Sequence, residues 1–484
     1  MEAKLLQKYD VVIGLEVHAQ LLTDSKIYNS DSTSYGESPN QNVSVITLAH
    51  PGTLPKLNKK VIELAVKMGL ACNSEISRYQ IFDRKNYFYP DLPKGYQLTQ
   101  DRTPICVGGY VSLWKEGVEE KRIALNRIHI EEDAGKSIHD ERGNDTLLDF
   151  NRSGVPLIEI VTEPVIESAE DAGALLGEIR KLVRYLEICD GNMEEGSLRC
   201  DANISIKPKG TDALGKKVEV KNMNSIRNVQ QAIEFETRRQ AELLELGKEI
   251  VSETRTFDAT VGKTFGMRTK EELNDYRYFP DPDLSSLEIS DQWLEQIKSS
   301  MPALPHELYL KFTSEFGIPT YDAGVLTENR EIALFFDELC TYSRNYKAAS
   351  NWVMGPLKSQ MNERKQTVAG LKLTPKRLSD LIDLVDTGKL NYTAASQMVF
   401  PELLSAANDE PLAIAEKLNL LQDGDEQSIR RTVEEVIAMF PEKVSEYKKG
   451  KKGLLSMFMG EVMKKTKGKV DPKIASELIK EKLN

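Results

Sequence analysis

Short stretches in which apolar and charged residues alternate strictly are the feature that most constrains the fold of this chain. In VVIGLEVHAQL, residues 11–21, the polar residues Glu16, His18 and Gln20 occupy every second position and apolar residues fill the positions between them. Successive side chains of a β-strand point to opposite faces. The segment is therefore predicted to be a strand with one apolar face and one polar face.

The same alternation returns in three further segments and at the end of a fourth. These segments are PLIEIV (156–161), SLRCDANISIK (197–207), KKVEVKN (216–222) and RIHIEEDAGKS (127–137). Their charged positions include Glu131, Glu132, Asp133, Glu159, Arg199, Asp201, Glu219 and Lys221. Several strands thus present carboxylates, interleaved with lysine and arginine, on one side of a sheet. For any single residue, a solvated or salt-bridged surface position remains the alternative.

Carboxylates that crowd one surface repel each other and need cations. Oxygen ligands combined with an imidazole suit Mg²⁺ or Mn²⁺ better than zinc, and such ions usually bind substrate phosphates. Four nearby cationic residues are suited to holding phosphates: Arg84, Lys85, Arg199 and Arg268. The pattern leads to the hypothesis of a nucleotide site on an open sheet.

The common phosphate-binding loops are excluded by the sequence. AGKS at 134–137 ends like a P-loop, but Ile130 stands where that motif needs a glycine. There is also no G-x-G-x-x-G before a predicted helix and no protein-kinase motif set. A phosphate site in this chain must therefore use a less common fold.

Two amphipathic helices are predicted in the first part of the chain. One begins at the cap residue Ser168 and continues to about residue 188, and the other extends from Ser225 to Gly247. After about residue 298 the pattern changes to helices separated by proline and glycine, as in the segment that starts at Thr374. The predicted domains are 1–298, 299–410 and 411–484.

The charge of the chain is unevenly distributed. The whole sequence has a formal net charge of −11, yet residues 441–484 contain twelve lysines against six acidic residues. A basic end on an acidic body can attract a phosphate backbone, although a solvated lysine-rich helix face is the alternative.

Composition points to a cytoplasmic protein. No run of about 18 apolar residues suggests a membrane span, and the first ten residues lack the apolar segment of a secretory signal. The five cysteines are widely scattered without a C-x-x-C pair, so we expect reduced thiols.

Longer motifs carry a resemblance to a known family. FDRKNYFYPDLPKGYQLTQ (82–100), NRSGVPLIEIVTEP (151–164) and MEEGSLRCDANIS (193–205), together with GLEVH at residue 14 and VEVKNMNS at residue 218, closely resemble the B subunit of the aspartyl/glutamyl-tRNA amidotransferase. The resemblance covers nearly the whole chain. It implies an α+β fold in which a large antiparallel-sheet "cradle" domain flanked by helices precedes an all-helical domain and a small helical tail that contacts tRNA.

The resemblance also implies a reaction and its partners. Such a protein uses ATP and Mg²⁺ to phosphorylate the side-chain carboxylate of Glu on tRNA-Gln or Asp on tRNA-Asn. Ammonia from the glutaminase, which is the A subunit, then displaces the phosphate within a heterotrimer that also contains the C subunit. The chain itself lacks the sequence signatures of an amidase or glutaminase, so a partner must supply the ammonia.

Carried onto this sequence, the family's metal residues are His18, Glu132 and Glu159. A second metal position would involve Glu16, Asp201 and Glu219, with Glu132, Glu159 and Asp201 as the central catalytic carboxylates. Many members also bind zinc through four cysteines. Asn29, Asp31, Ser44 and Thr47 stand at those positions here, so zinc is not expected and packing or hydrogen bonds must hold this segment.

Two other functions stay open at this point. A free-standing ATP-dependent carboxylate ligase explains the acidic sheet but leaves the helical part and the basic end without a role. A non-catalytic tRNA-binding scaffold explains the basic end, but an acidic sheet face would repel phosphate unless it held cations.

Overall fold

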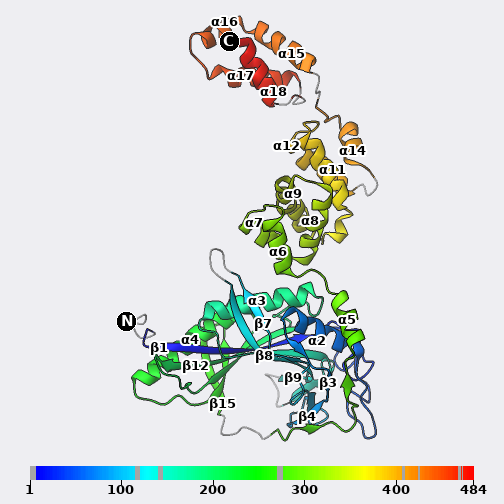
Figure 1. Ribbon diagram of the computed structural model, residues 1–484, viewed down its shortest axis with the longest axis vertical. Helices are drawn as coiled ribbons and strands as arrows, with labels where there is room; N and C mark the ends of the chain where they lie inside the picture. Colours follow the sequence, from blue (N-terminus) through cyan, green and yellow to red (C-terminus); the bar gives the residue numbers. More distant parts are fainter. Residues whose placement is uncertain are drawn as a thin grey trace. The chain divides into compact units, whose positions relative to one another are not determined.

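The computed structural model describes residues 7–114, 120–139, 145–269, 276–405, 409–422, 426–466, 470 and 472–483. The chain divides into two compact units, Met1–Leu304 and Pro305–Asn484 (Figure 1).

A ten-stranded sheet forms the centre of the first unit. Its strand order is β15-β14-β13-β12-β1-β11-β8-β6-β2, and β7 pairs with β8 beside this path. The strands are β1 (Tyr9–Gln20), β2 (Glu75–Ile76), β6 (Cys106–Val107), β7 (Tyr110–Leu113), β8 (Lys121–Glu132), β11 (Pro156–Thr162), β12 (Leu198–Pro208), β13 (Val218–Met223), β14 (Glu253–Asp258) and β15 (Lys263–Thr269). Among these described strands the pairings are antiparallel except β13 with β14. The predicted mostly antiparallel sheet is confirmed.

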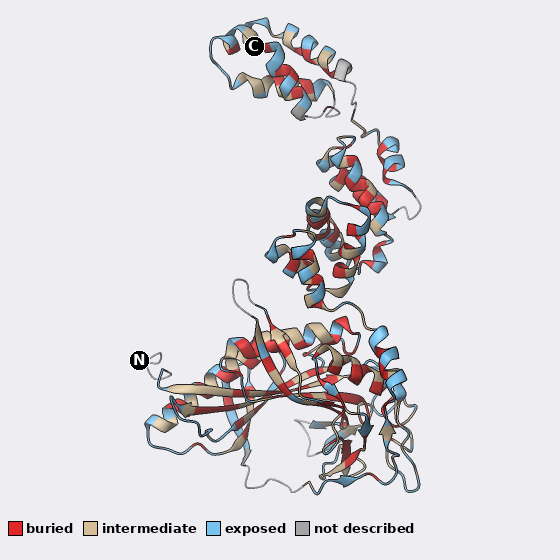
Figure 2. Ribbon diagram, in the orientation of Figure 1, coloured by how far each residue is buried: buried red, intermediate tan, exposed pale blue. Residues whose placement is uncertain are grey.

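Helices cover one face of this sheet. They are α2 (Lys59–Ala71), α3 (Ala169–Tyr185), α4 (Ile226–Glu245) and α5 (Asp291–Ser299) (Figure 1). The two predicted caps are present, since Ser168 Oγ accepts a hydrogen bond from Asp171 N and Ser225 Oγ accepts one from Asn228 N. Ile13, Leu15, Val17 and other apolar residues of the central strands are fully buried. Buried segments, red in Figure 2, run along the strands and along the helices that cover them. The opposite face of the same strands is left to the polar residues.

Strand β1 lies between β11 and β12 and fixes which polar residues become neighbours. His18 pairs with Glu159 of β11 and with Arg199 of β12, and Glu16 pairs with Asp201 of β12. Residues nearly two hundred positions apart in the sequence thereby share one small surface.

Short strands add three smaller sheets to the first unit. β4 (Asp83–Asn86) pairs with β5 (Tyr96–Thr99) and β16 (Phe279–Pro280), β9 (Lys136–His139) pairs with β10 (Thr146–Asp149), and β3 (Tyr79–Gln80) pairs with β17 (Leu287–Glu288). The first of these places the motif at 82–100 next to the segment that follows residue 276.

The described elements of the second unit are all helical. They are α6 (Pro305–Ser314), α7 (Thr320–Leu326), α8 (Arg330–Tyr342), α9 (Tyr346–Trp352), η2 (Val353–Leu357), α10 (Lys358–Arg364), η3 (Ala369–Leu371), α11 (Pro375–Asp386), α12 (Tyr392–Ala394), η4 (Ala395–Val399), α13 (Phe400–Ser405), α14 (Pro411–Lys417), α15 (Glu426–Met439), α16 (Pro441–Lys448), α17 (Leu454–Lys465) and α18 (Pro472–Leu483). Thr374 caps α11 and Pro375 opens it, as predicted. Along the described chain, no helix is both long and apolar enough to cross a membrane.

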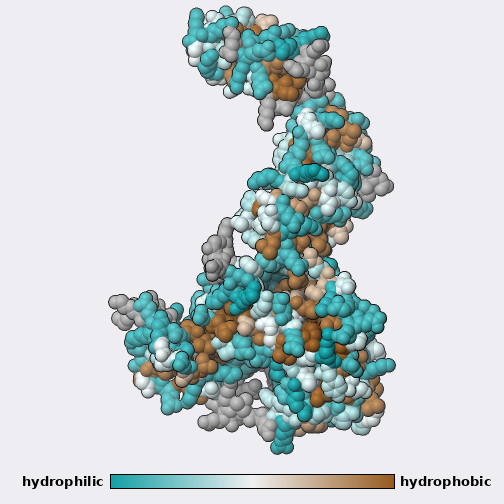
Figure 3. All heavy atoms as spheres, in the orientation of Figure 1, coloured by the Kyte–Doolittle hydropathy of each residue, from teal (hydrophilic) through white to brown (hydrophobic). Residues whose placement is uncertain are grey.

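The last four helices have a hydrophobic cluster of their own. It includes Val433, Phe458, Val462 and Ile479, all fully buried. The visible surface of these helices is largely hydrophilic (Figure 3). A separate tail domain over residues 411–484 remains a prediction, and this cluster supports it.

The four residues at the zinc-ligand positions are linked by hydrogen bonds. Thr47 Oγ1 lies 2.5 Å from Asp31 Oδ2 and accepts a hydrogen bond from Asn29 Nδ2 at 3.0 Å. Ser44 N donates to the same Asp31 oxygen at 2.8 Å, and Asp31 N donates to Asn29 Oδ1 at 2.8 Å. Asp31 thus accepts from both ends of segment 44–47 and ties it to segment 29–31.

We expect Asp31→Ala to lower the free energy of unfolding by about 2 kcal/mol, because it removes a charged acceptor from two donors. Asp24→Ala, which removes an exposed carboxylate seven residues away, is the matched control. Urea unfolding measures both variants.

Elemental analysis of the wild-type chain should find no zinc; stoichiometric zinc would contradict this account of the segment.

Candidate active site

A large polar cavity lies on the face of the sheet opposite the helices. Its volume is about 800 Å³. Residues from β1, β8, β11, β12 and β13 line it, and Tyr87, Tyr89 and Tyr276 add aromatic side chains. The charged residues of its lining are Glu16, His18, Lys85, Glu131, Asp133, Arg152, Glu159, Arg199, Asp201, Lys217, Glu219 and Lys221.

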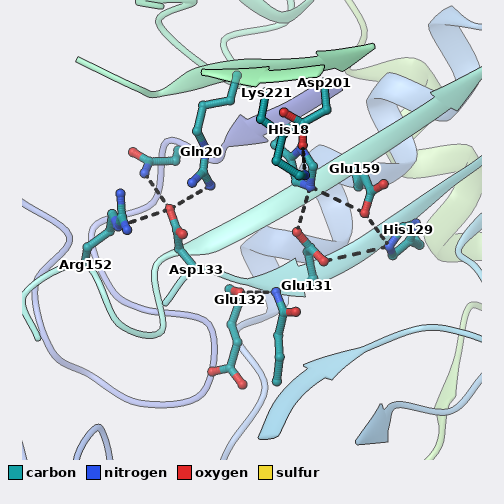
Figure 4. A network of polar contacts seen from close by, with 12 residues as sticks. His18, Gln20, His129, Glu131, Glu132, Asp133, Arg152, Glu159, Asp201 and Lys221 are labelled. Atoms are coloured by element: carbon teal, nitrogen blue, oxygen red, sulfur yellow. Dashed lines mark hydrogen bonds and ion pairs between the residues drawn. The ribbon is translucent and has the colours of Figure 1, made fainter. Parts of the chain in front are cut away.

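The first of two acidic clusters in this cavity consists of His18, Glu131 and Glu159. His18 Nε2 lies 3.3 Å from Glu131 Oε1 and 3.5 Å from Glu159 Oε2. Behind them, the buried His129 places its Nε2 3.1 Å from Glu159 Oε2 and 3.9 Å from Glu131 Oε2 (Figure 4). One imidazole and two carboxylates thus converge from three neighbouring strands, with a second imidazole that orients the carboxylates.

Opposite charges determine the ionisation of this first cluster. Burial by itself would lower the pKa of His18, but the carboxylates of Glu159 and Glu131 raise it well above its ordinary value. Burial would likewise raise the pKa of Glu159, yet the charge of His18 and a hydrogen bond from His129 hold it well below the usual range. The cluster therefore favours a cation between its carboxylates.

Glu132, predicted as a metal ligand, lies outside both acidic clusters. Its Oε1 accepts a hydrogen bond from Leu98 N at 2.9 Å and pairs with Lys94. These groups line a separate cavity of about 100 Å³. The reason is the alternation of strand β8: Glu131 shares a face with His129, whereas Glu132 follows the buried Ile130 on the other face. The structure thus places Glu131, and not Glu132, beside His18 and Glu159, and counting in steps of two from His129 would have found it.

The second acidic cluster consists of Glu16, Asp201 and Glu219, which the structure brings together as predicted from the sequence. Burial is the main cause that raises the pKa of Glu16, and the neighbouring carboxylates Glu159 and Glu219 raise it further. Lys221, which was not predicted as a site residue, places its ammonium between Asp201 and Glu219.

The predicted cationic residues divide between the two faces. Arg84 points away from the cavity, where its Nε lies 2.5 Å from Asp281 Oδ2 and its Nη2 lies 2.9 Å from Asp283 Oδ2. Lys85, the next residue of β4, lines the cavity, and its Nζ lies 4.9 Å from the ring centroid of Tyr276. Arg84 therefore lies in an ion-paired cluster and does not line the cavity, because neighbouring residues on a strand face opposite ways.

Arg199 lines the cavity and is paired with Asp133. Its Nη2 lies 2.9 Å from Asp133 Oδ2. Gln20 Nε2 donates to the same oxygen at 3.0 Å (Figure 4). These contacts hold the guanidinium at the cavity wall. Arg268 pairs with Thr254 through the backbone of β15, and its side chain lies outside the described residues.

Comparisons with known proteins match both units of the chain. The family model described as "GatB/GatE catalytic domain" matches residues 11–295, and the model described as "GatB domain" matches residues 334–483. The chain belongs to the family formed by the B subunit of the aspartyl/glutamyl-tRNA(Asn/Gln) amidotransferase.

Curated members of this B-subunit family align with the chain from end to end. The B subunit of Caldicellulosiruptor bescii is 46% identical over 479 residues, which cover 98% of this chain and 99% of the relative. That of Clostridium tetani is 46% identical over 476 residues with the same coverage, and that of Geotalea uraniireducens is 47% identical over 480 residues, 99% of this chain and all of the relative. The resemblance stated from the motifs is therefore confirmed, as is the assignment to an amidotransferase ligase.

For this member of the family, the two adjacent glutamates of β8 provide a matched pair of variants. We expect Glu131→Gln to weaken Mn²⁺ binding at least tenfold, because it removes one of two carboxylates beside His18. Glu132→Gln should leave the affinity within twofold, since Glu132 faces the other cavity. Isothermal titration of each purified variant measures this; equal effects of the two substitutions would contradict the placement.

Proposed function

We propose that this chain is the ATP-using component of a tRNA-dependent amidotransferase and that its cavity activates the side-chain carboxylate of a misacylated tRNA. The substrates are Glu-tRNA(Gln), Asp-tRNA(Asn) or both. The single observation that carries the proposal is the cluster of His18, Glu131 and Glu159 at the wall of a cavity lined by further charged residues. Family membership supplies the substrate class, and the cluster supplies a place for the phosphoryl transfer.

Activation is needed because the oxygen of a carboxylate is a poor leaving group. An oxygen of the substrate carboxylate attacks the γ-phosphorus of ATP, the bond from that phosphorus to the β–γ bridging oxygen breaks, and ADP leaves. Ammonia then attacks the acyl carbon, the bond between that carbon and the phosphorylated oxygen breaks, and the amide forms while inorganic phosphate leaves and the nitrogen loses a proton. Such a transfer depends on positioning and charge neutralisation rather than on a covalent enzyme group.

The first acidic cluster fits Mg²⁺ by its donor set. It combines two carboxylates and one imidazole, and His129 supports the carboxylates from behind, as outer hydrogen-bond partners do around metal ligands. When bound, a divalent ion at this position neutralises negative charge on phosphate oxygens. His18, Glu131 and Glu159 would hold it, and His129 would keep Glu159 in place.

Lys85 is suited to orienting the nucleotide or the aminoacyl end. Burial would lower its pKa, but Glu131 and Glu159 raise it, so the ammonium stays charged at the cavity wall. Tyr87 and Tyr276 lie beside it and limit the directions in which it can point. Arg199, fixed by Asp133, supplies another positive charge on the same wall.

The partners follow from the same reaction. Ammonia is the second substrate, and we propose that a glutaminase, the A subunit of the family's enzymes, supplies it within a heterotrimer that includes the C subunit. The relatives' names describe each of them as one lettered component of an amidotransferase, which agrees with an enzyme of several chains. A free-standing ligase would need no such partner. A non-catalytic scaffold would need no acidic cluster that holds a cation.

The reaction is tested by variants of the first acidic cluster in the complex with its partner proteins. We expect His18→Ala and Glu159→Gln to lower ADP formation in the presence of Glu-tRNA(Gln), Mg²⁺ and glutamine at least a hundredfold. Glu288→Gln, which changes an exposed carboxylate of the same unit, is the control. Wild-type rates in both cluster variants would exclude this cluster from the reaction.

The lysine-rich end is proposed to contact the tRNA backbone. Replacing the exposed Lys448, Lys449 and Lys451 with alanine should weaken tRNA binding and reduce the slope of log Kd against log salt by up to about 3. The same change at Lys209, Lys216 and Lys248, exposed on the first unit, alters net charge equally and is the control. Filter binding at several salt concentrations measures both sets; equal slopes for the two would favour a merely solvated tail.

A further inference from the structure

The second acidic cluster already holds a positive charge. Lys221 Nζ lies 2.5 Å from Asp201 Oδ2 and 2.9 Å from Glu219 Oε1. The ammonium therefore lies between two of the three carboxylates of the cluster.

Neutral donors occupy further oxygens of the same cluster. Asn203 Nδ2 donates to Glu16 Oε1 at 2.9 Å, and Thr254 Oγ1 donates to Glu219 Oε2 at 2.8 Å. Each of the three carboxylates thus already has a hydrogen-bond donor. A divalent ion entering here would have to displace the ammonium and reorganise these contacts.

The first acidic cluster differs in this respect. Among the described residues, its carboxylates pair with His18 and His129 at distances of 3.1–3.9 Å, and no lysine or arginine nitrogen lies within 4 Å of them. Imidazole can lose its proton and become a metal ligand. A lysine ammonium has no lone pair to offer and must leave before a metal can bind.

We propose that Lys221 is the resident cation of the second cluster, so that the cavity takes one divalent ion, at His18, Glu131 and Glu159, and the lysine provides the other positive charge. This inference rests on the proposed function for its first metal position. It replaces the second metal position predicted from Glu16, Asp201 and Glu219.

The arrangement suits the transfer of a phosphoryl group from ATP to the substrate carboxylate, because both of these molecules are negatively charged. Two-metal sites place a positive charge on each side of the transferred group. Mg²⁺ requires near-octahedral geometry and gives up its waters reluctantly, whereas a lysine ammonium on a flexible stem can follow a phosphate oxygen. The side chain of Lys221 is 31% exposed and lines the cavity, so its ammonium can reach a bound phosphate.

The test counts Mn²⁺ ions by electron paramagnetic resonance on the full chain purified with its partner proteins, without nucleotide. We expect one bound ion in the wild type and two in Lys221→Met, because the substitution leaves three carboxylates without their cation. Lys217→Met removes an exposed lysine from the same cavity rim and should still bind one ion.

A second variant covers the case in which Lys221→Met does not fold. Asp201→Asn should leave the single Mn²⁺ bound with affinity within twofold of wild type, because Asp201 contacts the lysine and not the ion. Loss of an ion in Asp201→Asn, two ions in the wild type, or one ion in folded Lys221→Met would overturn the inference. No bound ion in the wild type would instead remove the metal position on which the proposed function depends.

Discussion

The whole site depends on the crowding of carboxylates on the polar face of one sheet. Strand β1 lies between β11 and β12, and its alternation buries Leu15 and Val17 under the helices while it directs Glu16 and His18 into the cavity. The apolar face fixes the register, because a slip of one residue would exchange the two faces. The energy of the hydrophobic core thereby holds together charges that would otherwise repel each other.

These charges are balanced in two different ways. In the first cluster, the imidazole of His18 lies beside two carboxylates and, after losing its proton, would bind a metal ion together with them. In the second, the ammonium of Lys221 and the donors Asn203 and Thr254 already satisfy the acidic oxygens. One sheet face thus offers both a replaceable and a built-in positive charge, and a nucleotide bound between them would meet one on each side.

Much of this could be predicted from residues alone. Period-two alternation identified the strands and their polar face, cap residues such as Ser168 and Thr374 located helix starts, and the long motifs identified the family. Adjacent residues were the difficult case: Glu131 and Glu132, like Arg84 and Lys85, differ only in the face they occupy, and strict alternation from His129 resolves the first pair. The partners of Arg84, Asp281 and Asp283, lie nearly two hundred residues away, so no local pattern could show that Arg84 forms ion pairs on its face of β4 while Lys85 faces the cavity.

The segment at 29–47 illustrates the same point. Its four polar residues at the zinc-ligand positions are linked by hydrogen bonds through Asp31. The sequence predicts only that other contacts replace the cysteines, because the hydrogen-bond partners depend on how the segments at 29–31 and 44–47 pack against each other.

The most direct measurement follows oxygen atoms through the reaction of the assembled complex. Glu-tRNA(Gln) labelled with ¹⁸O in the side-chain carboxylate is converted with ATP, Mg²⁺ and glutamine, and the inorganic phosphate is analysed by mass spectrometry. Activation by phosphorylation predicts that each phosphate carries one ¹⁸O from the carboxylate when both of its oxygens are labelled. Amide formation accompanied by unlabelled phosphate would contradict the transfer of the phosphoryl group to the substrate carboxylate.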